Sequence, residues 1–183
     1  FALMIFSYFK NFYTNWSESL RQKNFRLHFI FTALSYFFLF KYCRIVMTIL
    51  ENRKGTQIAD KFLALIPPID FSTSIFILTY SVLTIFILAN ISNPERFLKA
   101  IQAYCLLMAM RTITIYLVPL EPPVGLILLK DPVSNFFMSG HHGSYIVEDL
   151  FFSGHVSTAM LFFIISENRK TKYLLLGLSF SIA

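Results

Sequence analysis

Long apolar runs separated by short polar segments dominate this chain, and the pattern predicts membrane-spanning helices. Three runs have about the 17–25 residues that a helix needs to cross a bilayer, at 27–50, 74–91 and 96–118. A fourth run begins near Ser153 and ends at Ile165, and a fifth begins near Tyr173. We therefore expect an all-α fold, a polytopic transmembrane helical bundle with about five helices in this sequence and six in the complete protein.

Prolines and charges refine the helix boundaries. Pro94 follows Asn93 and suits the first turn of a helix, where its missing N–H is not needed. Lys41 and Arg44 interrupt the first apolar run. Because a charged group is costly inside a bilayer, these two side chains must reach toward the membrane surface or face the protein interior.

The first 26 residues differ from the rest because they mix aromatic and charged side chains. Tyr8, Tyr13 and Trp16 are of the types that favour the headgroup level of a membrane. We expect residues 1–26 to be an interfacial segment, packed at the membrane surface, although its first part could also be the tail of an earlier helix. Residues 27–183 are expected to form one membrane-embedded domain.

The composition supports this reading and excludes others. The chain is 56% hydrophobic and 14% charged, against about 25% charged residues in soluble domains. Its net charge of +6 is better explained by cytoplasmic flanks of membrane helices than by nucleic-acid binding. Cys43 and Cys105 offer neither a disulfide framework nor a metal motif. Because the chain begins with Phe1 and stops within an apolar run at Ala183, we expect both ends to continue in a longer protein.

The distribution of lysine and arginine predicts the orientation in the membrane. Basic residues are concentrated in three short segments on one side by parity, at 11–26, 92–99 and 167–172. The long 119–152 segment lies on the other side and contains Lys130 among several carboxylates. The positive-inside rule therefore places the 119–152 segment on the exoplasmic or periplasmic side. The 51–73 segment, with Arg53, Lys54 and Lys61, goes against the rule.

One stretch carries most of the candidate chemistry, at the start of the fourth apolar run. Residues 148–158 read Glu-Asp-Leu-Phe-Phe-Ser-Gly-His-Val-Ser-Thr. Gly154 allows backbone N–H groups to approach an anion, and Ser153 adds a hydroxyl donor. The imidazole of His155 can transfer a proton at neutral pH. Oxyanion donors beside a proton-transfer group are what phosphoryl transfer requires.

A second motif precedes this stretch, and together the two resemble a known family. Arg111-Thr-Ile-Thr-Ile-Tyr116 is followed by a proline-rich turn, Pro119-Leu-Glu-Pro-Pro123, and then by the Asp149-x-x-x-Ser153-Gly-His155 segment. This order is similar to that of the sphingomyelin synthase family, within the lipid phosphate phosphatase superfamily. Two positions depart from the family pattern, since Glu148 replaces a glycine and Val156 replaces a threonine. The family's last motif, His-Tyr-x-x-Asp, would follow Ala183.

The resemblance implies a mechanism and a set of site residues. His155 would transfer the proton of the leaving or accepting alcohol. Apart from what the resemblance implies, Asp149 is a second catalytic candidate, as the orienter of a basic group. Ser153, Gly154 and Arg111 would hold phosphate oxygens, and a later histidine would attack phosphorus. The expected substrate is a phospholipid or sphingolipid in the bilayer. The resemblance implies no metal or other cofactor, and no nucleic acid is expected as a partner.

Each candidate also has a structural explanation. Ser153 is a suitable N-cap for the fourth helix, which is compatible with binding an anion there. His155 could cap that helix or pack at a helix interface. Arg111 could pair with a carboxylate of the following segment or extend toward the surface, and Asp149 could be an ordinary loop carboxylate. His141 and His142 suggest a metal only superficially and fit a solvated loop.

Three functions remain open from the sequence. The first is a lipid phosphotransferase that moves a phospho-headgroup between lipids on the outer face of the membrane. The second is a simple lipid phosphate phosphatase, in which water accepts the phosphoryl group. The third is a membrane protein that retains the fold without catalysis. A later His-x-x-x-Asp motif in the full-length chain would favour the first two over the third.

Overall fold

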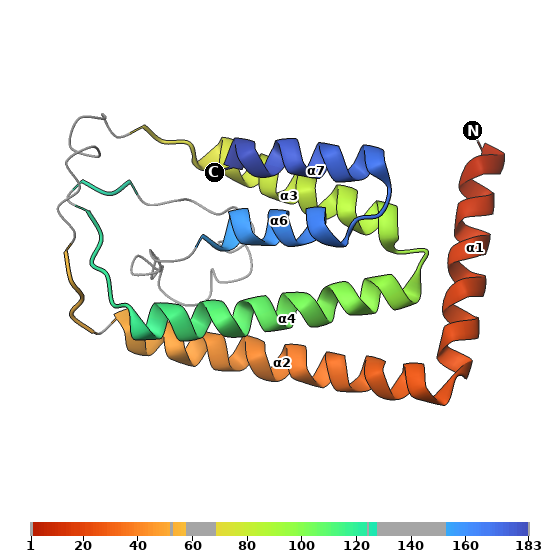
Figure 1. Ribbon diagram of the computed structural model, residues 1–183, viewed down its shortest axis with the longest axis horizontal. Helices are drawn as coiled ribbons and strands as arrows, with labels where there is room; N and C mark the ends of the chain where they lie inside the picture. The colour runs from red at the N-terminus through yellow and green to blue at the C-terminus, as the bar shows by residue number, and fades with distance from the viewer. Residues whose placement is uncertain (1, 52, 58–68, 124, 128–152, 183) are drawn as a thin grey trace.

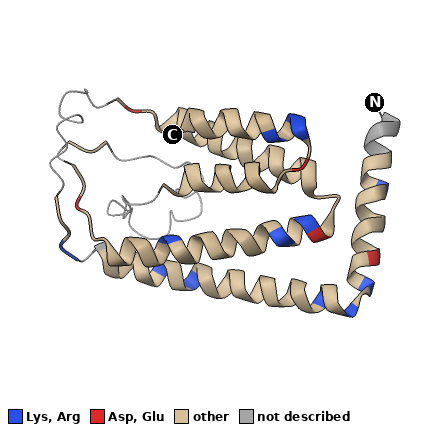
Figure 2. Cartoon of the chain, viewed as in Figure 1, with Lys and Arg blue, Asp and Glu red and all other residues tan. Residues whose placement is uncertain are grey.

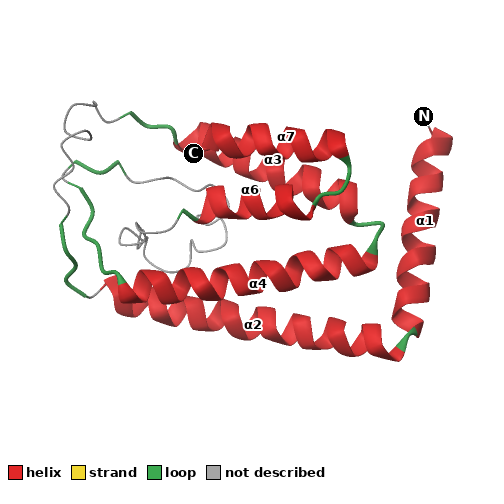
Figure 3. Cartoon of the chain, viewed as in Figure 1, coloured by secondary structure: helices red, strands yellow, loops and turns green. Residues whose placement is uncertain are grey.

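The fold is all-α, as the sequence predicts (Figures 1 and 3). The structure is a computed structural model that describes residues 2–51, 53–57, 69–123, 125–127 and 153–182. Within these residues the helices are α1 (Ala2–Arg21), α2 (Lys23–Glu51), α3 (Ser72–Asn90), α4 (Pro94–Leu117), α6 (Gly154–Ile165) and α7 (Arg169–Ile182). Helices α2, α3, α4, α6 and α7 run roughly along one axis, and α1 lies across one end (Figure 1).

The described helices have the lengths and surfaces of a multi-pass membrane protein. By length and composition, α2, α3 and α4 could each cross a bilayer. Large apolar side chains lie on the outside of the bundle, as at Phe31, Phe37 and Phe180, each at least 70% exposed. Helices α6 and α7 have 12 and 14 residues, which at 1.5 Å per residue extend about 18 and 21 Å. Both are shorter than the roughly 30 Å hydrocarbon core.

Local signals at the helix starts explain most of the boundaries. The Asn93 side chain accepts a hydrogen bond from the Arg96 N–H, and Pro94 occupies the first turn of α4, as predicted. Ser153 is the N-cap of α6, which confirms the structural role expected for it. The fifth helix was expected from Tyr173, but α7 begins at Arg169. The Asn168 side chain accepts from two backbone N–H groups of its first turn, and this cap draws the charged residues into the helix.

Helix α1 is attached to the bundle by the only tryptophan in the chain. Trp16 donates from its ring N–H to the Ile91 carbonyl at 2.7 Å, in the turn between α3 and α4. Its ring also packs edge-on against Phe25, Phe29 and Phe97. A half-buried tryptophan with its N–H bonded in this way suits the membrane interface. The expected interfacial segment is therefore a separate helix that lies against the end of the bundle.

Helices α2 and α4 are linked by polar contacts within the apolar bundle. Gln102 donates to the Thr32 hydroxyl at 2.9 Å. Nearer the other end, the Cys43 sulfur lies 3.1 Å from the Thr112 hydroxyl oxygen. Thr112 donates its own hydroxyl proton to the Met108 carbonyl, so the Cys43 thiol is the donor. Interhelical hydrogen bonds of this kind contribute roughly 0.6 kcal/mol each in a membrane, where apolar contact alone gives little preference over lipid.

Arg53 explains part of the basic segment that goes against the positive-inside rule. Its guanidinium donates to the Tyr116 carbonyl at 2.7 Å and to the Ile115 carbonyl at 3.4 Å, and it lies over the Tyr116 ring. These carbonyls belong to the last turn of α4, where a cation is favoured by the helix dipole. Arg53 is therefore held by a helix terminus, which gives it a structural role on this side.

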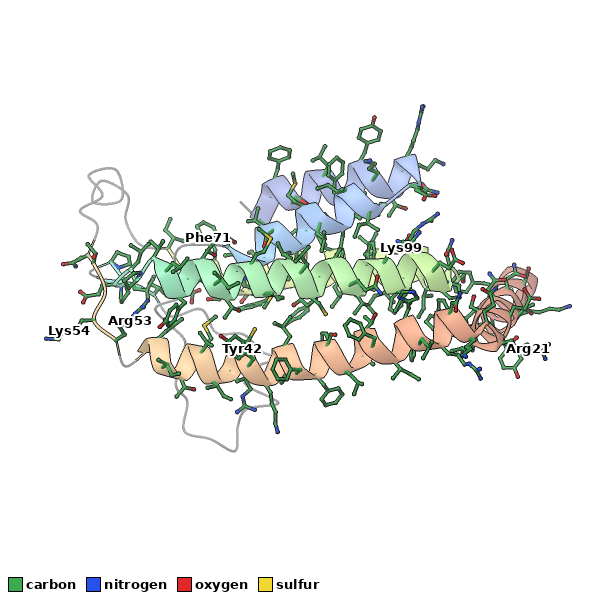
Figure 4. All side chains as sticks on the ribbon, turned by 60° about the horizontal axis from the view of Figure 1, so that its bottom comes forward. Arg21, Tyr42, Arg53, Lys54, Phe71 and Lys99 are labelled. Carbon is green, nitrogen blue, oxygen red and sulfur yellow. The ribbon has the colours of Figure 1, made fainter. Side chains whose placement is uncertain are left out.

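Charged residues are concentrated at the end of the bundle where α1 lies (Figure 2). Figure 4 shows Arg21 at that end and Arg53 and Lys54 at the opposite one. An ion pair between Arg96 and Glu167 joins the start of α4 to the turn between α6 and α7. Lys41 and Arg44 are exposed on α2, so they do not face the protein interior, which was one of the two positions expected for them. The three basic segments that the sequence groups by parity thus lie at one end of the fold.

The two ends of the bundle should face opposite sides of the membrane. With Cys43 and Cys105 replaced by alanine, a cysteine at Gln57 is expected to react with an impermeant thiol reagent in intact cells. A cysteine at Asn168, at the basic end, should react only after permeabilisation, because the positive-inside rule places that end in the cytoplasm. The mass shift of the protein measures labelling of each cysteine, before and after permeabilisation. Labelling of both positions in intact cells would contradict the bundle as a membrane-crossing unit.

Candidate functional site

The side chain of Arg111 lies directly on the backbone of Gly154, which brings the two sequence motifs together. A β-carbon at Gly154 would lie 3.1 Å from Nε and 3.2 Å from Cζ of Arg111. Such distances are tighter than ordinary van der Waals contact, so the absence of a side chain is what permits the approach. Arg111 and Gly154 are 43 positions apart in the sequence, and the pairing of α4 with α6 joins them.

The contact places a guanidinium at the N-terminus of α6. Gly154 is the first residue of that helix, and Ser153 caps it by accepting a 3.4 Å hydrogen bond from the Val156 N–H. The first N–H groups of a helix carry a partial positive charge and attract anions. A guanidinium adds a full positive charge and donors in a planar fork. The two together form a local positive field suited to an anion with several oxygens, such as a phosphate.

His155 is the next residue along α6, and its ring is held against α3. The imidazole lies edge-on to the Phe76 ring, with centroids 5.6 Å apart and an interplanar angle of 74°. The helix thus presents His155 one position after the residue on which Arg111 rests. An imidazole beside an anion site can donate a proton to an oxygen of the bound group or accept one from it.

Arg111, Gly154 and His155 all line one cavity of about 700 Å³. The remaining lining is contributed mainly by apolar and aromatic side chains of α2, α3, α4 and α6. Among the described residues that line the cavity, Arg111 is the one fixed charge, because the others are apolar, hydroxyl-bearing or histidine. A cavity of this size and composition is typical of a site for a small molecule with an apolar body and a polar or charged group.

The site lies inside the bundle, about two turns of α4 from the end of that helix. Arg111 is six residues before Leu117, the last residue of α4, which corresponds to about 9 Å of helix. Helix α6 begins beside Arg111 and is only 12 residues long. Its N-terminus is set back from the ends of α2 and α4, as Figure 1 shows. An anion bound there would lie where the apolar surroundings strengthen its attraction to Arg111.

The structure brings together three of the five residues that the sequence singles out. Arg111, Gly154 and His155 line the cavity, while Ser153 is exposed at the start of α6 with its side-chain oxygen in the cap. Asp149 lies outside the described residues, as do Glu148, His141 and His142. No group of three potential metal-ligating side chains occurs in the part of the chain that the structure describes.

Several cavity residues were not expected from the sequence. Tyr104, two turns before Arg111 on α4, was expected only to pack, but it lines the cavity. Phe76 and Thr79 of α3 and Thr158 of α6 line it as well. The Thr79 hydroxyl is buried and has no hydrogen-bond partner within the described residues. Helical spacing would have identified Thr158, which lies one turn after His155, whereas the α3 residues depend on tertiary packing that no motif indicates.

A comparison with protein-family models, curated proteins and solved structures finds no match for this chain.

Replacing Gly154 with alanine tests the contact between α6 and Arg111. The added methyl group would lie 3.1 Å from Nε, so the guanidinium must shift by a few tenths of an ångström. The affinity for a phosphate-bearing probe, phosphatidic acid, should fall by about tenfold or less, because a hydrogen bond to a charged group, which contributes about 1.5–3 kcal/mol, is weakened and not lost. The dissociation constant can be measured by thermal stabilisation of the purified protein in detergent. Gly177→Ala in α7 is the matched control, since a β-carbon there meets nothing within 4 Å. Equal affinity in both variants would exclude Arg111 and Gly154 as a joint anion site.

Proposed function

We propose that this chain is an integral membrane lipid phosphotransferase or phosphatase resembling the sphingomyelin synthase family. In this proposal a phospho-headgroup is moved from one lipid to an acceptor through a histidine-based site on the outer face of the membrane. Arg111, Gly154 and Ser153 bind the phosphate, and His155 transfers the proton. Asp149, which precedes the Ser-Gly-His motif in the sequence, orients a basic group of the site.

The observation that supports the proposal best is the contact of Arg111 with the N-terminus of α6 in the lining of a mainly apolar cavity. The contact joins an anion site to a space suited to hydrocarbon. A lipid phosphoester has these two parts, a charged phosphate and an apolar body, in one molecule. His155 lies at the junction of the two, where the bond between phosphate and alcohol would be.

The proposed reaction has two steps. In the first, a nucleophile attacks phosphorus and the bond from phosphorus to the leaving alcohol oxygen breaks, while His155 donates its proton to that oxygen. In the second, the neutral His155 removes a proton from an acceptor alcohol or water, whose oxygen attacks phosphorus and releases the nucleophile. The resemblance assigns the nucleophile to the later histidine motif. Arg111 and the N–H groups of α6 stabilise the charge on the phosphate oxygens in both steps.

The location of the site supports lateral access by a lipid. The end of the bundle that carries Arg111 and α6 is opposite the basic end, which the positive-inside rule assigns to the cytoplasm. The substrate would therefore come from the outer leaflet. A recessed phosphate site within the apolar part of the bundle allows a lipid to reach it while its chains remain among apolar side chains.

Replacing His155 tests the proposed chemistry in the full-length protein. Because a positioned acid–base group contributes about 10²–10⁴-fold in rate, His155→Asn is expected to lower transfer or hydrolysis from a phospholipid at least about a hundredfold. A nitrophenyl phosphodiester should lose much less activity in the first step, since its leaving group needs no proton. Activity on the phospholipid is measured as release of labelled headgroup. The first step on the nitrophenyl phosphodiester is measured as a pre-steady-state burst of nitrophenol. His28→Ala, at an exposed position of α2, is the control.

Different results would decide between the candidate functions. Formation of a new phospholipid with an added acceptor alcohol identifies a transferase, whereas release of free phosphate or phospho-headgroup to water alone identifies a phosphatase. Activity of His155→Asn close to that of the unmodified protein on the phospholipid would contradict the assignment of His155. Absence of turnover in the unmodified full-length protein on every lipid tested would favour the non-catalytic alternative.

A further inference from the structure

The cavity extends far beyond the phosphate site. Its lining runs along α4 from Arg111 to Phe97, a separation of 14 residues or about 21 Å. One leaflet contributes about half of the roughly 30 Å hydrocarbon core of a bilayer, or about 15 Å. The cavity is therefore long enough for a hydrocarbon chain that starts at Arg111 and continues through the bundle.

The cavity is bounded on two sides by helices that pack mainly with other partners. Helix α2 packs against α1 and α4, whereas α3 packs against α7, α6 and α4. Both helices nevertheless line the cavity, and Phe37 of α2 and Leu83 of α3 do so while 75% and 41% exposed, respectively. Exposed residues in the lining indicate that the cavity opens outward between α2 and α3. In a bilayer this opening faces lipid, which offers one kind of occupant, a hydrocarbon chain.

The deep part of the cavity is formed by tightly packed side chains. Phe86 of α3 and Phe162 of α6 stack with ring centroids 4.1 Å apart and an interplanar angle of 9°. Ala100 of α4 belongs to the same buried cluster, and all three line the cavity. Phe162 lies seven residues beyond His155 on α6, which is about 10 Å deeper. We call these three residues the deep end of the cavity.

We propose that the deep end receives the terminus of a single hydrocarbon chain of the lipid whose phosphate lies at Arg111, and that Phe86, Phe162 and Ala100 set the chain length accepted. The assignment of a phosphate to the head of that lipid rests on the proposed function. Ala100, Phe86 and Phe162 are only 2%, 2% and 6% exposed, so they form a closed wall of the cavity against which the chain terminus would stop. The stacked rings of Phe86 and Phe162 form a wall that the chain cannot displace easily, because each is buried within the core cluster.

Chain-length selection by fit follows from the physics of the membrane. A chain that moves from bilayer hydrocarbon into an apolar cavity gains little from the hydrophobic effect, because both surroundings are apolar. Discrimination must then come from packing, where each methylene too many forces side chains from their positions. In apolar pockets one methylene changes selectivity by roughly 10–200-fold.

Photo-crosslinking tests the location of the chain without requiring turnover. The probe is phosphatidic acid with a diazirine at the end of one 16-carbon chain, added to the full-length protein in nanodiscs, and mass spectrometry identifies the labelled peptides. We expect labelling at Phe86, Ala100 or Phe162, reduced by excess unlabelled phosphatidic acid and by Arg111→Gln. Labelling confined to outward-facing residues such as Phe38 would overturn the proposal. Crosslinks at the deep end in a protein without activity would contradict the proposed function and leave this inference standing.

Two substitutions with opposite effects test the chain-length role. Ala100→Leu fills the deep end and should shift the preference, measured as the ratio of crosslinking for 16-carbon over 10-carbon probes, toward the short chain by about tenfold or more. Phe162→Leu removes ring volume and should shift the ratio toward the long chain. Leu106→Phe adds similar bulk on α4 at a position 64% exposed and outside the cavity lining, so it serves as the control. Thermal melting shows whether the variants remain folded. If both cavity variants are folded and the crosslinking ratio is unchanged, the role of these residues is overturned. The same holds if Leu106→Phe changes the ratio equally.

Discussion

The contact between Arg111 and Gly154, inside the bundle, is the constraint on how α4 and α6 pack against each other. A guanidinium about 9 Å inside the end of α4 is costly unless polar or charged groups surround it. Helix α6 is short and starts at the depth of Arg111, with a glycine where the side chain must pass. The N–H groups at the start of a helix are positively polarised and do not offset the charge of a guanidinium, so the two together favour an anion.

The opposite end is organised around Trp16 and explains how the cavity keeps its shape. Its ring packs with Phe25 and Phe29 at the start of α2 and with Phe97 at the start of α4. Phe29 and Phe97 also line the cavity. Helix α1 is thus linked through one aromatic cluster to the far end of the space whose other end holds Arg111. The aromatic cluster around Trp16 therefore joins α1 to α2 and α4, two of the four helices that line the cavity.

Much of the fold could be predicted from the sequence, because apolar runs and helix caps are local signals. The starts of α4 and α6 follow from Asn93, Pro94 and Ser153, whereas the start of α7 was missed because the Asn168 cap outweighs the charge of the residues after it. The pairing of Arg111 with Gly154 was suggested only through a family resemblance. Phe76, Phe86 and Phe162 carry no motif in a chain with 22 phenylalanines, so their place in the cavity depends on tertiary packing.

Different contacts hold the two halves of the bundle, apolar packing in one and hydrogen bonds in the other, and this difference indicates how a lipid could enter without disrupting the bundle. Helices α3, α6 and α7 share a core in which Phe86, Phe162 and Leu175 are buried, so this half is held by dense packing. Helix α2 is held to α4 by hydrogen bonds at Thr32 and Cys43 and by Arg53 at the end of α4. The main packing partners of α2 are α1 and α4, whereas those of α3 are α7, α6 and α4. A chain passing between α2 and α3 would then displace lipid from exposed side chains and leave the hydrogen bonds that hold α2 in place.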